Sequence, residues 1–250
     1  MQPSLWPTIR DWWTERRRRE GFRRSCAQFL ANLWQYLRDS APARRRQLYG
    51  DVDYDWEHRV NTTSATVGWR DRLMGLFLSP YQATEPALFH EMLGTVNLDL
   101  AGFTFIDLGS GKGRTLLMAS DYPFRRIIGV EVLPALHRIA EQNIRDYKSE
   151  SQKCFDVVSI CADARSFTFP REPILLYLFN PLPEAGLAQT IHNLEDSLRR
   201  HPRPVYVIYH NPLLEHLLIG SSLLTKTAST HQYSIFAARI PAGDGFPNTS

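Results

Sequence analysis

Cysteine is scarce in this sequence, and its three residues, Cys26, Cys154 and Cys161, form no CxxC pair. A small, odd number of separated cysteines argues against a disulfide framework and against the usual zinc motifs. Cys154 and Cys161 flank or end a predicted strand. We therefore expect both to be buried as small apolar side chains.

Long apolar runs are also missing. No run reaches the roughly 18–20 residues that a membrane-spanning helix needs. The N-terminal region also lacks the apolar core of a signal peptide. These absences predict a cytoplasmic protein. The composition, with 43% hydrophobic and 22% charged residues among 250, is typical of a globular protein with one large domain or a domain with an extension.

Positive charge is concentrated at one end of the chain. The first 50 residues contain eleven arginines, no lysine and four acidic residues, whereas residues 51–250 contain 18 basic and 22 acidic residues. Between residues 10 and 38 the apolar side chains recur on one face of a predicted helix, and arginines crowd its start. Such a helix could bind an acidic partner or an anionic membrane surface, or simply pack on its own domain. Because the excess is local, we infer no obligate nucleic-acid partner.

From residue 100 onward, short apolar runs alternate with amphipathic stretches. The runs predict seven strands, at residues 103–108, 126–132, 156–161, 174–179, 204–210, 222–229 and 231–239. Helices between the first five predict parallel strands, whereas the short turn between the last two requires an antiparallel pair. The expected fold is therefore α/β, a Rossmann-like, mostly parallel seven-stranded sheet with helices on both faces and an antiparallel last strand.

The first predicted strand leads into FIDLGSGKGR, residues 105–114, in which three glycines alternate with other residues. Ligands of open α/β sheets bind outside the carboxyl ends of the strands, so this turn is the expected cofactor site. The turn does not match the phosphate-loop pattern GxxxxGK[ST], because Gly113 follows Lys112, or the dinucleotide pattern GxGxxG, because Arg114 takes the place of the third glycine. Asp107, ahead of the glycines, would repel a pyrophosphate and attract a cationic amine.

DLGSGKG resembles motif I, D/E-x-G-x-G-x-G, of the class I S-adenosylmethionine-dependent methyltransferases. It matches all four fixed positions of the motif, and the wider resemblance covers about residues 80–240. The resemblance implies S-adenosyl-L-methionine as the cofactor. It also implies that the carboxylate and the turn bind it through Asp107, Gly109, Ser110, Gly111 and Gly113.

Two further acidic residues fit the same family. Glu131 ends the second predicted strand, where a carboxylate can accept hydrogen bonds from both ribose hydroxyls. Asp163, after the third strand, matches the family's adenine-reading acid. The resemblance implies that the Ala164 amide meets an adenine ring nitrogen and that Val132 packs on the adenine face.

The acceptor site is expected after the fourth strand, in YLFNPLPEAG at residues 177–186. The side-chain carbonyl of Asn180 could orient an amine nucleophile. The stretch resembles the [DNS]PP[YFW] box of enzymes that methylate adenine, cytosine or glutamine nitrogens. Leu182 replaces the second proline and Pro183 replaces the aromatic residue, which disfavours a stacked nucleobase. A loop that merely ends the strand is the open alternative.

Two more stretches resemble methyltransferases. YQATEPALFHEML is similar to the loop and helix before motif I in non-SET protein-lysine methyltransferases, which implies that Tyr81, Thr84 and Glu85 close over the methionine end of the cofactor. YHNP, with FIDLGSGKGR, is shared with a group of bacterial methyltransferases of unassigned substrate. Its His210 is a candidate base or a structural histidine. The candidate catalytic residues are therefore Tyr81, Asn180 and His210.

The predicted function is in-line methyl transfer to a nitrogen acceptor. A protein side chain is favoured over a small molecule or a nucleic acid, and a non-catalytic cofactor-binding subunit and a nicotinamide oxidoreductase remain as alternatives. Within the second part of the chain, residues 51–69 predict a long loop and residues 84–96 a helix with Thr84 as N-cap. We predict four parts. Residues 1–50 form an Arg/Trp-rich helical extension, and residues 51–100 form a loop and helix that cover the cofactor and substrate site. Residues 101–240 form the methyltransferase core, and residues 241–250 form a flexible tail.

Overall fold

The computed structural model describes residues 52–63 and 83–239, together with scattered residues between Arg10 and Trp34. Most of the predicted N-terminal extension, Tyr81 and the predicted C-terminal tail lie outside the described residues. The predictions made for them stay predictions.

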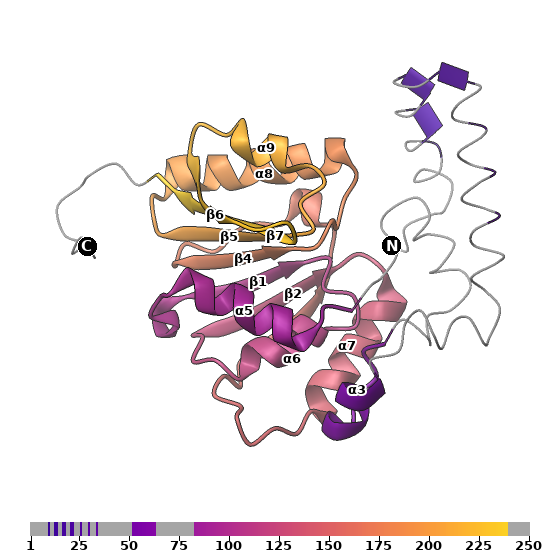
Figure 1. Ribbon diagram of the computed structural model, residues 1–250, viewed down its shortest axis with the longest axis vertical. Coiled ribbons are helices and arrows are strands. Elements are labelled where there is room, and N and C mark those ends of the chain that lie inside the picture. Colours follow the sequence, from indigo (N-terminus) through magenta and orange to yellow (C-terminus); the bar gives the residue numbers. More distant parts are fainter. Residues whose placement is uncertain are drawn as a thin grey trace.

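The described chain forms one seven-stranded sheet (Figure 1) in the order β3-β2-β1-β4-β5-β7-β6. The first five strands are parallel, and β7 is antiparallel to both β5 and β6. The predicted fold class is confirmed. The strands are β1 (Thr104–Leu108), β2 (Arg126–Glu131), β3 (Val157–Cys161), β4 (Ile174–Leu178), β5 (Val205–His210), β6 (Leu224–Ser229) and β7 (Tyr233–Ala238).

Helices cover both faces of the sheet, as Figure 1 shows. Alternate side chains of the central strands enter two separate cores, which is why these strands are apolar along their whole length. The first core packs α5 (Pro86–Val96) and α6 (Arg114–Ser120) on one face, and the second packs α8 (Glu184–Arg200) and α9 (Glu215–Ile219) on the other. The remaining elements are α3 (Val52–His58), α7 (Pro134–Asp146), η2 (Leu100–Gly102) and η3 (Ala164–Ser166).

Three local predictions were wrong. Part of the expected loop at 51–69 is the helix α3, whose side chains contact distant residues such as Arg114 and Lys148 that local periodicity does not reveal. Cys161 is exposed, because it ends the partly covered edge strand β3, whereas Cys154 is buried as expected. Thr84 is not the N-cap of α5: Glu85 takes that place without a side-chain hydrogen bond.

The register of the parallel strands determines where the polar side chains meet. Asp107 pairs with Tyr177 across β1 and β4, and Glu131 and His210 are the last residues of β2 and β5. The carboxyl ends of these strands therefore bring the predicted site residues to one edge of the sheet. In the part of the chain that the structure describes, no helix has both the length and the apolar character to span a membrane.

Candidate functional site

The glycine turn between β1 and α6 has the backbone that its sequence predicts. Gly109, Gly111 and Gly113 have φ angles of 83°, 55° and 82°, in the left-handed region that other residues rarely adopt. A Cβ on Gly109 would lie 2.7 Å from the Cβ of Pro181, in the loop after β4. Gly109 is therefore required by the protein's own packing, in addition to any space that a cofactor needs.

Hydrogen bonds hold the turn against β2, the neighbouring strand. The amides of Gly109 and Ser110 both donate to the carbonyl of Val130, at 2.8 and 3.1 Å. A Cβ on Gly129 would lie 2.6 Å from the hydroxyl oxygen of Ser110, so the Ser110 side chain is packed between the turn and β2. Its amide is bonded to Val130, whereas its buried Oγ has no hydrogen-bond partner among the described residues. The contact of Ser110 with a cofactor stays a prediction.

Asp107 is a buried carboxyl, 3% exposed, at the end of β1. Among the described residues, the Thr115 hydroxyl donates a hydrogen bond to its Oδ2. Burial raises the pKa of Asp107 to about 7; the Thr115 hydrogen bond opposes this shift, and the nearby charge of Glu131 adds to it. A carboxylate that is costly to ionise alone suits a cationic ligand, whose charge would offset the cost.

Glu131 is buried and held in one orientation by two backbone amides. Gly111 donates to Oε2 and Leu133 donates to Oε1, both at 2.8 Å. A carboxylate oxygen can accept more than one hydrogen bond, so this orientation is compatible with the predicted contact to a ribose diol. The bond from Gly111 also ties the position of this carboxylate to the glycine turn.

Asp163 lies at the end of β3 next to Arg165. The Arg165 guanidinium binds both carboxylate oxygens, with the closest contact at 2.6 Å, and the Arg165 amide donates to Oδ1. Partial burial would raise the pKa of Asp163, but the hydrogen bonds and charge of Arg165 outweigh it and lower the pKa. Ala164 is buried beside it, and Val132 is half-buried. An adenine amino group would share Asp163 with Arg165.

A chain of buried polar side chains connects β4 and β5 to the segment before α5. The Tyr177 hydroxyl lies 2.9 Å from the Thr84 hydroxyl oxygen and 2.8 Å from Nδ1 of His210. The His210 ring stacks on Phe179 at 3.9 Å. Burial lowers the pKa of His210 to about 4, so its imidazole is neutral at pH 7. Thr84 and His210 thus meet through Tyr177, while Glu85 is exposed.

Asn180 links two loops at the same edge. Its φ is 45°, its Nδ2 donates to the carbonyl of Asn211 at 2.7 Å, and its Oδ1 accepts from the Tyr209 hydroxyl at 2.9 Å. Both side-chain polar atoms therefore have partners within the protein. Asn180 therefore holds the loop after β4 against the end of β5. Its predicted role in orienting an amine nucleophile stays a prediction.

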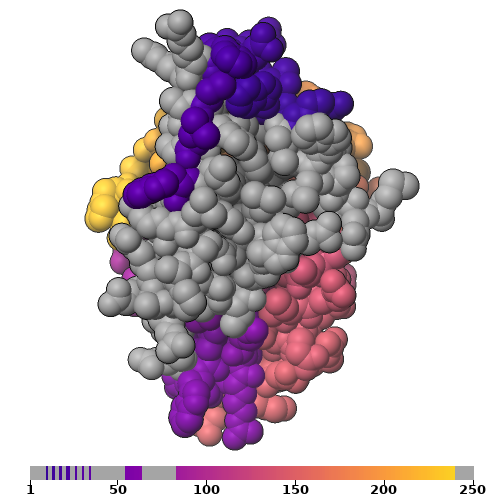
Figure 2. Space-filling view, turned by 90° about the vertical axis from the view of Figure 1, so that its right-hand side faces the viewer, coloured from indigo at the N-terminus to yellow at the C-terminus, as the bar shows by residue number. Residues whose placement is uncertain are grey.

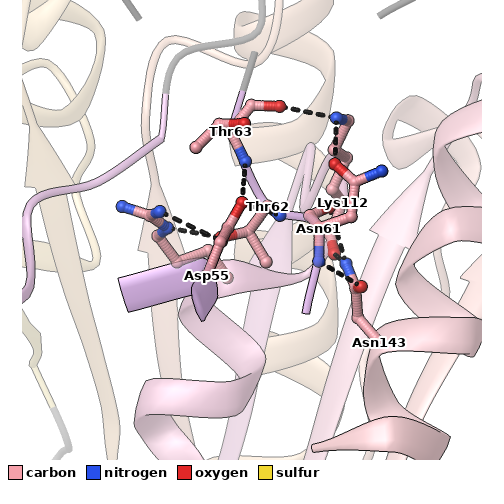
Figure 3. A network of polar contacts seen from close by, with 7 residues as sticks. Asp55, Asn61, Thr62, Thr63, Lys112 and Asn143 are labelled. Carbon is pink, nitrogen blue, oxygen red and sulfur yellow. Dashed lines mark hydrogen bonds and ion pairs between the residues drawn. The ribbon is translucent and has the colours of Figure 1, made fainter. Parts of the chain in front are cut away.

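Sequence reasoning missed a polar network on the other side of the turn (Figure 3). In this network Lys112 and Arg114, which flank the last glycine, bind the segment formed by residues 52–63. Asn143 of α7 binds the backbone of Lys112. The signal was present, since a buried turn that carries two basic residues needs oxygen partners, but their identity depends on the tertiary structure. The partners on the other elements are Asp55, Asn61, Thr62, Thr63 and Asn143.

The family comparison matches residues 79–167 to the model described as "Histone methylation protein DOT1". The matched range contains the predicted loop with Tyr81, Thr84 and Glu85, the glycine turn, Glu131 and Asp163. The resemblance to S-adenosylmethionine-dependent methyltransferases is confirmed. The predicted enzyme class and cofactor agree with this match, and the two buried carboxyls beside the glycine turn fit a ligand with an amine and a ribose. The comparison with curated protein sequences found no match.

Among solved structures, the chain is similar to an RNA methyltransferase from Salinibacter ruber in complex with S-adenosyl-L-homocysteine, with 20% identity, a TM-score of 0.41, and coverage of 66% of this chain and 97% of the other. It is also similar to a predicted N6-adenine-specific DNA methylase from Listeria monocytogenes, with 14% identity, a TM-score of 0.48, and coverage of 64% and 52%. A third is magnesium protoporphyrin IX methyltransferase from Synechocystis with bound cofactor, at 13% identity, a TM-score of 0.43, and 61% and 76% coverage.

Proposed function

We propose that this protein transfers a methyl group from S-adenosylmethionine to a nitrogen atom of a protein side chain. The observation that carries the proposal is the edge of the sheet where the left-handed glycine turn, Asp107 and Glu131 meet. Two buried carboxyls beside a turn that lacks a phosphate-binding pattern suit a ligand with an ammonium group and a ribose.

The cofactor supplies a methyl group already activated by its sulfonium, so the chain's part is to bind and align the reactants. Asp107 binds the cofactor's ammonium, and Glu131, fixed by the amides of Gly111 and Leu133, binds the ribose hydroxyls. Pro181, in the loop after β4, packs against Gly109 of the glycine turn, and this contact supports an acceptor site in that loop, next to the proposed cofactor site.

His210, held by Tyr177, orients the acceptor amine. An amine attacks only as its neutral form, so it must lose a proton before or during transfer. When the Tyr177 hydroxyl accepts from Nδ1–H and donates to Thr84, Nε2 of His210 carries a lone pair that can accept a hydrogen bond from the amine. With a pKa near 4, the imidazole orients the amine as a neutral acceptor and is a weak base.

A protein acceptor is favoured for two reasons. The matched family model is described by histone methylation, and histones are proteins. The loop after β4 has Leu182 and Pro183 where nucleobase methyltransferases resembling it have a proline and an aromatic residue, so it offers no ring at that position for a flipped base.

The test is label transfer from isotopically labelled S-adenosylmethionine into a cell extract, with the Asp107→Asn, Glu131→Gln double variant as the inactive control. We expect label in protein that survives nuclease and is released by protease, on a lysine or another side-chain nitrogen. Label that nuclease removes, or label in small molecules, would reassign the acceptor. A wild-type protein that binds S-adenosylhomocysteine but transfers no label would be a non-catalytic subunit.

A further inference from the structure

Residues 52–63 form a polar strap along the side of the cofactor turn. The strap consists of α3 and the short stretch that ends at Thr63. It lies beside α7 at one end of the molecule (Figures 1 and 2), far in sequence from the turn it contacts. Figure 3 shows Lys112 and Asn143 pointing toward it from the turn and from α7.

Lys112 reaches from the cofactor turn into the strap. Its side chain is 0% exposed, although it carries an ammonium group. Nζ donates to Oδ1 of Asn61 at 3.0 Å and to the carbonyl of Thr63 at 2.5 Å. An ammonium is buried only at a large cost unless oxygen atoms surround it, so these acceptors determine where the turn can lie.

Arg114, two residues later, binds the same strap. Its Nε donates to the Thr62 hydroxyl at 2.6 Å, and its guanidinium lies 3.3 Å from Asp55 and over the ring of Tyr54 at 4.8 Å. Asp55 also accepts from the amides of Thr62 and Thr63, at 2.8 and 2.9 Å. The strap therefore presents several oxygen acceptors to the two basic side chains.

Asn143 of α7 joins the strap and the turn directly. It accepts from the Asn61 amide at 2.8 Å, and its Nδ2 donates to the carbonyls of Asn61 and Lys112 at 3.0 and 2.9 Å. One buried carboxamide thus fixes the backbone of both segments. On the other side of the turn, the Gly111 amide binds Glu131, so a shift of the turn would move the proposed ribose carboxylate.

We propose that Lys112 is a positioning residue for the cofactor: by holding the strap, it fixes the glycine turn and, through Gly111, the carboxylate of Glu131. The inference rests on the proposed function, since it assumes that the turn binds S-adenosylmethionine. The glycines make the free turn costly to order, and contacts that order it in advance reduce the cost of binding. Lys112 acts through the backbone and touches neither the reacting methyl group nor the acceptor.

The test replaces Lys112 with methionine, which has a similar length and no charge. The dissociation constant of S-adenosylhomocysteine is measured by calorimetry well below the melting temperature. We expect Lys112→Met to raise it at least about tenfold, because the turn then samples other conformations. Leu194→Ala removes core volume on the opposite face of the sheet. It is the control for general instability, and we expect it to lower the melting temperature without raising the dissociation constant.

Asn61→Ala tests the hydrogen bond between Lys112 and Asn61 from the side of the strap. It keeps the proposal testable if Lys112→Met does not fold. Asn61 is exposed and keeps its backbone bonds to Asn143, and the variant removes the Oδ1 atom that accepts from Lys112. We expect about threefold weaker binding and faster amide exchange in residues 109–114, with unchanged exchange in β4.

The outcomes separate the two proposals. A wild-type protein that does not bind S-adenosylhomocysteine would overturn the proposed function, and the exchange measurement would still decide whether the strap orders the turn. Wild-type binding with unchanged affinity in both Lys112→Met and Asn61→Ala would overturn the positioning role. Equal loss of affinity in Leu194→Ala would do the same, because the effect would then follow from lost stability.

Discussion

Gly109 lies directly against Pro181: a Cβ built on the glycine would come within 2.7 Å of the proline Cβ. The two residues follow β1 and β4, which are neighbouring parallel strands. The contact joins the cofactor turn to the loop that is expected to receive the methyl acceptor. A change at either residue therefore affects both halves of the proposed site.

We expect Gly109→Ala to destabilise the protein even without a cofactor, by about 2–4 kcal/mol, since the new Cβ meets Pro181 and alanine is strained at φ 83°. Thermal unfolding of the ligand-free protein measures this. Adding Pro181→Gly removes the opposing Cβ and should recover the part due to the contact. An unchanged melting temperature in Gly109→Ala would show that this approach is looser than described.

Cofactor binding should depend on pH through Asp107. Burial raises the pKa of this carboxyl to about 7, so the neutral form increases as the pH falls below 7. A cationic amine requires the carboxylate, and binding should therefore weaken by up to about tenfold for each pH unit below the pKa. Calorimetric titration with S-adenosylhomocysteine between pH 5.5 and 7.5 measures the slope.

Asp107→Asn is the control for this dependence. The variant has no charge to titrate, so we expect weaker binding at pH 7.5 and a flat profile. A wild-type protein whose affinity is constant over the same interval would contradict the proposed contact between Asp107 and the ammonium group.

The positions that sequence analysis placed correctly are those determined by local pattern. Asp107 is the last but one residue of β1 and Glu131 is the last residue of β2, and the order of strands and helices brings parallel strand ends to one edge. The conformations of the three glycines follow from the residue type and the strand-to-helix turn. None of these conclusions requires knowledge of a contact between distant residues.

The features that sequence analysis missed are pairs far apart in the chain. Lys112 binds Asn61 and Arg114 binds Thr62, and no periodicity relates those positions. The same holds for Tyr209 and Asn211, the partners of Asn180, which the sequence does not reveal. The role of the Asn180 carbonyl in orienting an amine stays a prediction. Which donor meets which acceptor depends on distances and angles that are set only when the helices and strands pack together.

The arginine-rich N-terminal segment should be separable from cofactor binding. Residues 1–40 precede the strap in the sequence, and the glycine turn is anchored by bonds to the strap, to β2 and to α7. We expect a chain that begins at residue 41 to bind S-adenosylhomocysteine within about twofold of the full chain. If the segment recruits an acidic surface, the shortened chain should lose binding to vesicles that contain anionic phospholipid. Loss of the core fold would instead assign it a structural role.

His210 should contribute to methyl transfer without a titration near pH 6.5. Its pKa is lowered to about 4 by burial, so the imidazole stays neutral from pH 5.5 to 8 and its protonation should leave no inflection there. We expect His210→Ala to lower kcat by about 10–100-fold, because the acceptor loses an orienting hydrogen bond, while the cofactor dissociation constant changes little.

Tyr177→Phe distinguishes an orienting role from simple packing. The phenylalanine keeps the ring in its buried place but removes the hydroxyl between Thr84 and Nδ1 of His210. If that hydroxyl sets the imidazole tautomer, kcat should fall nearly as far as in His210→Ala, and the double variant should be no worse than either alone. Independent, multiplicative losses would mean that the two residues act separately, and an unchanged kcat in both single variants would make this histidine structural.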